Sequence, residues 1–194
     1  MQRTQSIRRE AGFTIVEVLV ALTLIACIAI GVAQLFHVAV ASTQAARHQT
    51  STSALAVQKL EQLRALRWVW ASDTGLPDQD ASTDLSTDPA TNTGAGLTPS
   101  PAGTLAANVP GYVDYLDARG RWVGTGAIPP GPAMFIRRWS IDRLPADPGN
   151  TLVFQVLVTT VRRASQAALG PGERTRLADE ALVATVTTRR VGWS

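Results

Sequence analysis

The sequence predicts an α+β protein in which one long N-terminal helix precedes a C-terminal antiparallel sheet. An apolar run begins at residue 13, amphipathic spacing follows to about residue 70, and strand-like alternation begins after residue 110. A helix followed by consecutive strands is typical of α+β domains, whereas βαβ folds alternate the two. The expected divisions are a basic leader, an apolar half-helix, an amphipathic half-helix, a variable loop and a sheet domain: residues 1–12, 13–41, 42–70, 71–110 and 111–194.

The apolar run has the length of a membrane span. Residues 18–40 contain no formal charge, and about 23 residues form a helix of roughly 35 Å, enough to cross a hydrocarbon core of about 30 Å. We therefore expect the lipid bilayer as a partner. Glu17 is the exception, because a carboxylate inside a span costs roughly 2.5–3.5 kcal/mol and needs a counter-charge.

Beyond the span, the same helix is predicted to continue to about residue 70. Ala56, Leu60 and Leu63 recur at helical spacing and form one apolar face, while Lys59 is among the residues assigned to polar positions. No proline occurs before Pro77, so nothing in the sequence interrupts the helix.

Residues 71–110 predict a long loop, or a partly disordered segment, between the helix and the sheet. The segment is rich in Asp, Ser, Thr, Gly and Pro, and it has no basic residue and no apolar period. Asp78 and Asp80 supply oxygens that suit calcium, but the spacing of a calcium loop is absent, so a solvated loop is favoured. The sequence leaves O-glycosylation of this segment open.

Residues 111–194 predict an antiparallel sheet. Gly120 supplies the positive φ of a hairpin turn, and later Gly and Pro clusters separate further strands. The apolar face of the sheet is expected to pack on helix residues 60–66. The expected strands cover residues 112–116, 121–123, 134–141, 152–161 and 181–191.

The N-terminal motif resembles the signal of type IV pilins and type II secretion pseudopilins. Gly12 is followed by Phe13 and an apolar helix, with Glu17 as the fifth residue after the glycine. The resemblance implies that a prepilin peptidase cuts between Gly12 and Phe13 and methylates the new amine of Phe13. It also implies a pilin-like fold, and that Glu17 pairs with the terminal amine of a neighbouring subunit, as a buried carboxylate requires.

Within this family the chain is most similar to PilV-type minor pilins, which implies a structural subunit that primes or joins a pilus. The implied partners are the prepilin peptidase, other pilin or pseudopilin subunits and an inner-membrane assembly platform. The basic leader favours a cytoplasmic N-terminus and an extracytoplasmic C-terminal domain. The resemblance implies that the chain lies in the bacterial inner membrane and is then incorporated into a pilus or pseudopilus. Two alternatives stay open: a minor pseudopilin of a type II secretion system, and a membrane-anchored binding module that never polymerises.

The sequence contains no pattern typical of an enzyme, a metal site or a cofactor site. His37 and His48 lie on the predicted helix without a nucleophile beside them, and Cys27 is the single cysteine, which excludes an intrachain disulfide. We therefore expect no catalytic residue, no metal and no cofactor.

Three Arg-Arg pairs in the sheet domain raise the question of nucleic acid. One member of each pair, Arg137, Arg162 or Arg189, is a candidate contact for DNA phosphates if the three form a stripe on one surface. The favoured interpretation is solubilising charge at strand ends, because the net charge is only +3.

Overall fold

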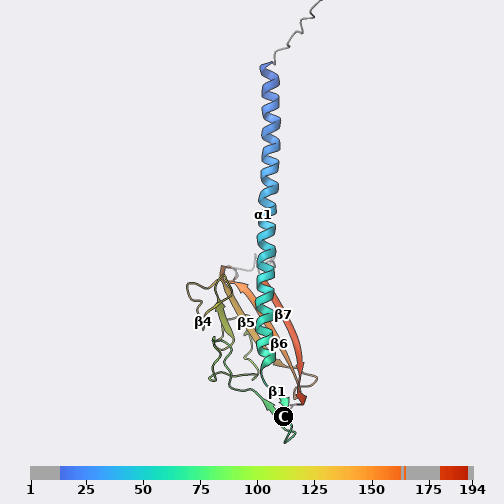
Figure 1. The fold of residues 1–194 in the computed structure, drawn as a ribbon, viewed down its shortest axis with the longest axis vertical. Helices are drawn as coiled ribbons and strands as arrows, with labels where there is room; N and C mark the ends of the chain where they lie inside the picture. The colour runs from blue at the N-terminus through green and yellow to red at the C-terminus, as the bar shows by residue number, and fades with distance from the viewer. Residues whose placement is uncertain (1–13, 163, 165–179, 192–194) are drawn as a thin grey trace, which may run out of the picture. The chain divides into compact units, whose positions relative to one another are not determined.

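A computed structural model describes residues 14–162, 164 and 180–191. The chain forms two compact units, Met1–Gln44 and Ala45–Ser194, and each is treated by itself. One helix, α1 (Ile15–Ala65), contributes residues to both units (Figure 1).

In the first unit, α1 exposes every described side chain. The helix begins after Thr14, whose hydroxyl oxygen accepts the backbone N–H of Glu17 at 3.3 Å, as an N-cap residue does. The hydroxyl of Thr23 donates back to the carbonyls of Leu19 and Val20 at 3.1 and 2.8 Å. The hydroxyls of Thr14 and Thr23 thus bond within the helix, as a lipid environment requires. By length and composition, α1 is the helix in the described chain that is able to cross a membrane.

The helix ends earlier than the sequence predicts. We expected it to reach about residue 70, but α1 stops at Ala65 and strand β1 (Trp68–Trp70) follows. Aromatic and β-branched residues such as Trp-Val-Trp favour a strand when partners are present. β1 pairs antiparallel with β2 (Pro77–Gln79) and parallel with β8 (Arg190–Val191), so long-range pairing overrides the local helical pattern.

The main sheet has five antiparallel strands in the order β4-β3-β5-β6-β7. It confirms the predicted antiparallel sheet and the hairpin at Gly120, which has a φ of +77°. The last predicted strand is wrong as a single element, because it divides into β7 and β8, which join different sheets. The five strands are β3 (Val113–Leu116), β4 (Trp122–Thr125), β5 (Phe135–Arg143), β6 (Thr151–Thr160) and β7 (Glu180–Thr188).

The hydrophobic core lies between the C-terminal part of α1 and one face of this sheet. Figure 1 shows the turns of α1 running along β5, β6 and β7. Helix residues Leu60 and Leu63 share one cluster with Trp139 and Phe154, which confirms the predicted packing of helix on sheet. The alternation along β6 follows from the two-residue period of a strand, with one face buried and the other partly covered.

The loop between helix and sheet is packed on the domain instead of being loosely solvated. Leu97 and Ser86 are each 1% exposed. The backbone N–H of Leu97 donates to the Asp80 carbonyl, and that of Ser100 to the Ile141 carbonyl, both at 2.8 Å. Backbone bonds and a few buried side chains therefore order a segment that has no apolar period of its own.

Candidate functional site

The N-terminal motif is described only from Thr14 onward, so Gly12 and Phe13 lie outside the described residues. Glu17 stands in the first turn of α1 and is exposed. Among the described residues, nothing pairs with its carboxylate. The structure therefore presents Glu17 as an exposed carboxylate at the start of an apolar helix.

The three candidate DNA-contact arginines do not form a common surface. Arg137 and Arg189 are 4% and 9% exposed, while Arg162 is exposed just after β6. Arg189 donates to the carbonyls of Val69 and Asp78 at 3.0 and 3.1 Å. The hypothesis of an exposed basic stripe is therefore wrong for Arg137 and Arg189, because each finds its acceptors inside the domain.

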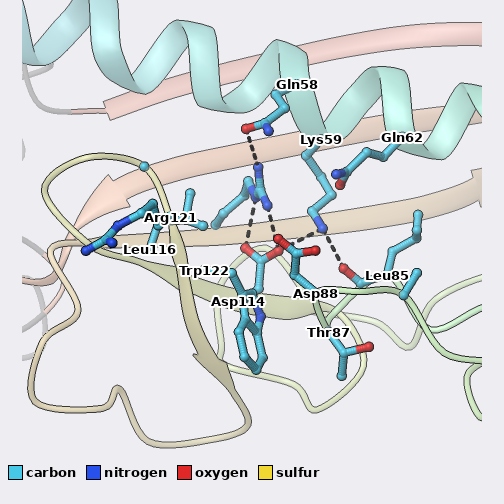
Figure 2. A pocket seen from close by; sticks show the side chains of 13 residues that line it. Gln58, Lys59, Gln62, Leu85, Thr87, Asp88, Asp114, Leu116, Arg121 and Trp122 are labelled. Carbon is cyan, nitrogen blue, oxygen red and sulfur yellow. Dashed lines mark hydrogen bonds and ion pairs between the residues drawn. The ribbon is translucent and has the colours of Figure 1, made fainter.

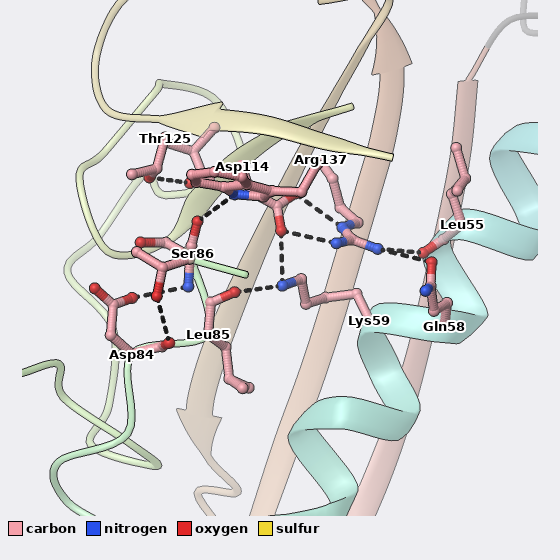
Figure 3. A network of polar contacts seen from close by, with 12 residues as sticks. Leu55, Gln58, Lys59, Asp84, Leu85, Ser86, Asp114, Thr125 and Arg137 are labelled. Atoms are coloured by element: carbon pink, nitrogen blue, oxygen red, sulfur yellow. Dashed lines mark hydrogen bonds and ion pairs between the residues drawn. The ribbon is translucent and has the colours of Figure 1, made fainter. Parts of the chain in front are cut away.

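The main polar feature of the domain is a buried ionic cluster formed by Lys59, Asp114 and Arg137. The Asp114 carboxylate on β3 accepts from Lys59 on α1, with Nζ and Oδ2 2.7 Å apart (Figure 3). It also accepts two N–H groups from Arg137 on β5, at 2.9 and 2.8 Å. The side chains of Lys59 and Asp114 are each 1% exposed, and that of Arg137 is 4% exposed. One carboxylate thus holds two cations from two different elements away from water.

The same cations also bind backbone on either side of the cluster. Lys59 Nζ donates to the carbonyl of Leu85 in the packed loop at 2.6 Å. Arg137 Nη1 donates to the helix carbonyl of Leu55 and to the side-chain oxygen of Gln58, at 3.2 and 3.3 Å. The cluster therefore connects α1, the loop, β3 and β5.

Sequence reasoning missed this cluster, although part of the signal was present. Lys59 was assigned to a polar position, but it lies three residues after Ala56 and four before Leu63, on the apolar face of the helix. It is also the only lysine in the chain. Asp114 gave no signal, because its partners lie far away in sequence and the pairing of β3 with β5 brings them together.

Burial lowers the pKa of Lys59 from its ordinary value to about 8, against the opposing attraction of Asp114. Between about pH 8 and 10, the unfolded chain therefore binds more protons than the folded chain. We expect the free energy of unfolding to rise by about 2 kcal/mol between about pH 7.5 and 9.5. Denaturant titrations of the full chain in detergent at the two pH values measure this difference.

The Lys59→Met variant is the control for this pH dependence. It removes the titrating amine, so its stability should stay nearly flat over the same range. Above about pH 10, the raised pKa values of Tyr112 and Tyr115, both caused by burial, act in the opposite direction. An equal rise in the variant would show that another group carries the effect.

A pocket of about 480 Å³ opens beside the cluster, between α1, the packed loop and the β3–β4 hairpin. Figure 2 shows Gln58 and Gln62 projecting from α1 on one side, with Asp88 and Trp122 on the other. Gln58, Gln62 and Asp88 are exposed, so the pocket is accessible to solvent. The ionic cluster forms its floor, since Lys59 and Arg137 are among its lining residues.

The described residues offer no grouping of His, Cys, Asp and Glu side chains able to hold a metal ion. Asp80, considered above for calcium, instead accepts from the backbone and hydroxyl of Thr83 at 2.9 and 2.6 Å. These bonds are the usual local turn pattern of an Asp side chain. Cys27 is a free, exposed thiol on the apolar half of α1.

Comparison with known protein families matches residues 7–33 to the prokaryotic N-terminal methylation motif. No curated protein and no solved structure matches the chain. The matched range contains the expected cleavage position and Glu17, and ends inside the apolar half of α1. The motif implies processing by a prepilin peptidase, anchoring by the N-terminal apolar helix and assembly with other pilins.

Proteins with this motif are structural subunits, so the expectation that the chain is not an enzyme is confirmed. The fold agrees with the motif, because a long N-terminal helix packs its C-terminal part on an antiparallel sheet, as in pilins. The prepilin-type motif at residues 7–33 implies the type IV pilin and pseudopilin family, and this pilin-like α+β fold agrees with it.

Proposed function

We propose that the chain is a minor pilin of the PilV type, which primes or joins assembly of a type IV pilus. The observation that carries the proposal is the position of Glu17, an exposed carboxylate in the first turn of an otherwise apolar span. Leaving such a group in hydrocarbon costs roughly 2.5–3.5 kcal/mol or more. A neighbouring subunit removes this cost when it supplies a cation at the same depth.

The cation in this proposal is the terminal amine created by cleavage before Phe13. N-methylation keeps that amine positively charged. Pairing between it and Glu17 then sets the register between subunits as α1 exchanges lipid for neighbouring helices. The proposal includes a cytoplasmic N-terminus and an extracytoplasmic domain, which the three arginines of the leader favour: Arg3, Arg8 and Arg9.

The Glu17→Val variant tests this role. It should insert into the membrane and be cut and methylated at Phe13, but its content in sheared pili should fall at least tenfold, because the counter-charge is lost. Intact mass shows whether processing is unchanged, and quantitative immunoblotting of pilus and membrane fractions measures incorporation.

The matched control is Thr23→Val, a polar-to-apolar change in the same span. In the described residues the Thr23 hydroxyl bonds to carbonyls of its own helix, so this variant should incorporate normally. Normal incorporation of Glu17→Val would contradict the assembly role, and a chain that keeps its leader in the presence of the peptidase would leave a plain membrane anchor.

A minor pseudopilin of a type II secretion system is the second candidate, because it shares the motif and the helix. Deleting the gene distinguishes a minor pilin from a minor pseudopilin. Loss of surface pili with intact protein secretion supports the pilin, whereas loss of secretion with intact pili supports the pseudopilin.

A further inference from the structure

The pocket beside the ionic cluster has no role in the assembly proposed above. Its volume of about 480 Å³ lies within the range of about 300–1,000 Å³ typical of small-molecule sites. The chemical groups of its accessible rim and buried polar floor indicate which class of ligand fits it.

The rim offers hydrogen-bonding groups that have no partner in the described part of the chain. These are the Gln62 amide, the Asp88 carboxylate and the NH₂ group of Gln58, whose oxygen already accepts from Arg137. Two amides and a carboxylate present donors and acceptors side by side. Such a mixed set matches a ligand whose groups both donate and accept, as hydroxyl groups do.

An aromatic surface completes the lining. Trp122 is half-buried, and its indole N–H donates to the Ser86 carbonyl at 2.9 Å. This bond fixes the ring and occupies its polar atom, so the remaining ring surface is apolar. A sugar ring, which has an apolar C–H face and a hydroxyl rim, is complementary to both kinds of surface.

The charges around the pocket balance, so they favour neither an anion nor a cation. Arg121 already pairs with Asp117 at 2.7 Å, and Arg137 is engaged by Asp114 through two bonds. The charged residues that line the pocket, together with the Asp117 partner of Arg121, are three cations and three carboxylates: Lys59, Arg121, Arg137, Asp88, Asp114 and Asp117.

We propose that this pocket binds a neutral saccharide unit of a glycan. The Trp122 ring packs against the sugar's C–H face, and Gln62 and Asp88 bind its hydroxyl groups. Lys59 and Arg137 hold the floor in place without needing a charged ligand. This role is independent of polymerisation and is tested on the purified subunit.

Saturation-transfer NMR on the full chain tests the proposal, in a zwitterionic detergent because glycosidic detergents would compete. The probes are lactose, cellobiose, maltose and diacetylchitobiose, with inorganic phosphate and citrate as anionic competitors. We expect saturation transfer to at least one disaccharide. The signal should fall at least fivefold in Gln62→Ala and in Asp88→Ala, and the anions should not displace the sugar.

The matched controls are Gln49→Ala and Asp142→Ala, which remove an exposed amide and an exposed carboxylate outside the pocket. Both should keep the full signal, and circular dichroism and thermal melting should be unchanged in all four variants. The absence of transfer to every disaccharide, displacement by phosphate or citrate, or an unchanged signal in the pocket variants would each overturn the proposal.

Discussion

Asp114→Asn should lower the free energy of unfolding by about 3–5 kcal/mol, because it leaves two buried cations without their shared counter-charge. Oδ2 of Asp114 lies 2.7 Å from Lys59 Nζ and 2.8 Å from Arg137 Nη2. Asparagine keeps one acceptor oxygen but no charge, so Arg137 stays desolvated without a counter-charge, and Lys59 must either stay charged beside it or lose its proton. Denaturant titration of the full chain in detergent measures the loss.

Two further variants serve as comparisons for Asp114→Asn, one inside the ionic cluster and one outside it. Lys59→Met should cost only about 1–3 kcal/mol, since Asp114 keeps its bonds to Arg137 and the main loss is the unpaired Leu85 carbonyl. Asp142→Asn, at an exposed position on the same sheet, should change stability by less than about 0.5 kcal/mol. A cost below about 1 kcal/mol for Asp114→Asn would mean that the cluster contributes little to stability.

Phe154→Ala should cost about 3–5 kcal/mol, because it empties the centre of the core between α1 and the sheet. Phe154 is 0% exposed on β6 and shares its cluster with Leu60, Leu63 and Trp139. The surrounding side chains come from several elements and are held by their own packing, so they close the cavity only in part. Thermal and denaturant unfolding of the full chain measure the effect.

Leu182→Ala on the adjacent strand is the matched control. Leu182 is 60% exposed and points to the other face of the sheet. It should therefore change stability by less than about 1 kcal/mol. Equal costs for the two variants would contradict the assignment of the buried face.

The ionic cluster also bears on how the helix is placed. A helix held by apolar contacts alone is able to slide or rotate by small steps at little cost, whereas ion pairs hold one register. Arg137 reaches the helix backbone at Leu55, and Lys59 reaches the loop at Leu85. Loss of Asp114 should thus loosen the docking of helix and loop together, beyond its effect on global stability.

Local patterns in the sequence predicted the elements that depend on neighbouring residues. The uncharged run after Glu17 predicted the apolar half of α1, and Gly120 predicted a hairpin turn with positive φ. Helical spacing of Ala56, Leu60 and Leu63 predicted the buried helix face. The N-terminal motif likewise lies within one short stretch, residues 7–33, so it was readable without any structure.

Contacts between residues far apart in sequence decided the remaining features of the fold, because no local pattern encodes such contacts. The segment Trp68–Trp70 became a strand only because β2 and β8 lie beside it. Arg137 and Arg189, which the sequence offered as candidate surface contacts for DNA, are buried and donate to acceptors far away in the chain. Sequence alone determined the α+β order, the apolar span and the processing motif. Tertiary packing decided the buried charges, since their desolvation is tolerable only where folding brings acceptors from distant residues to them.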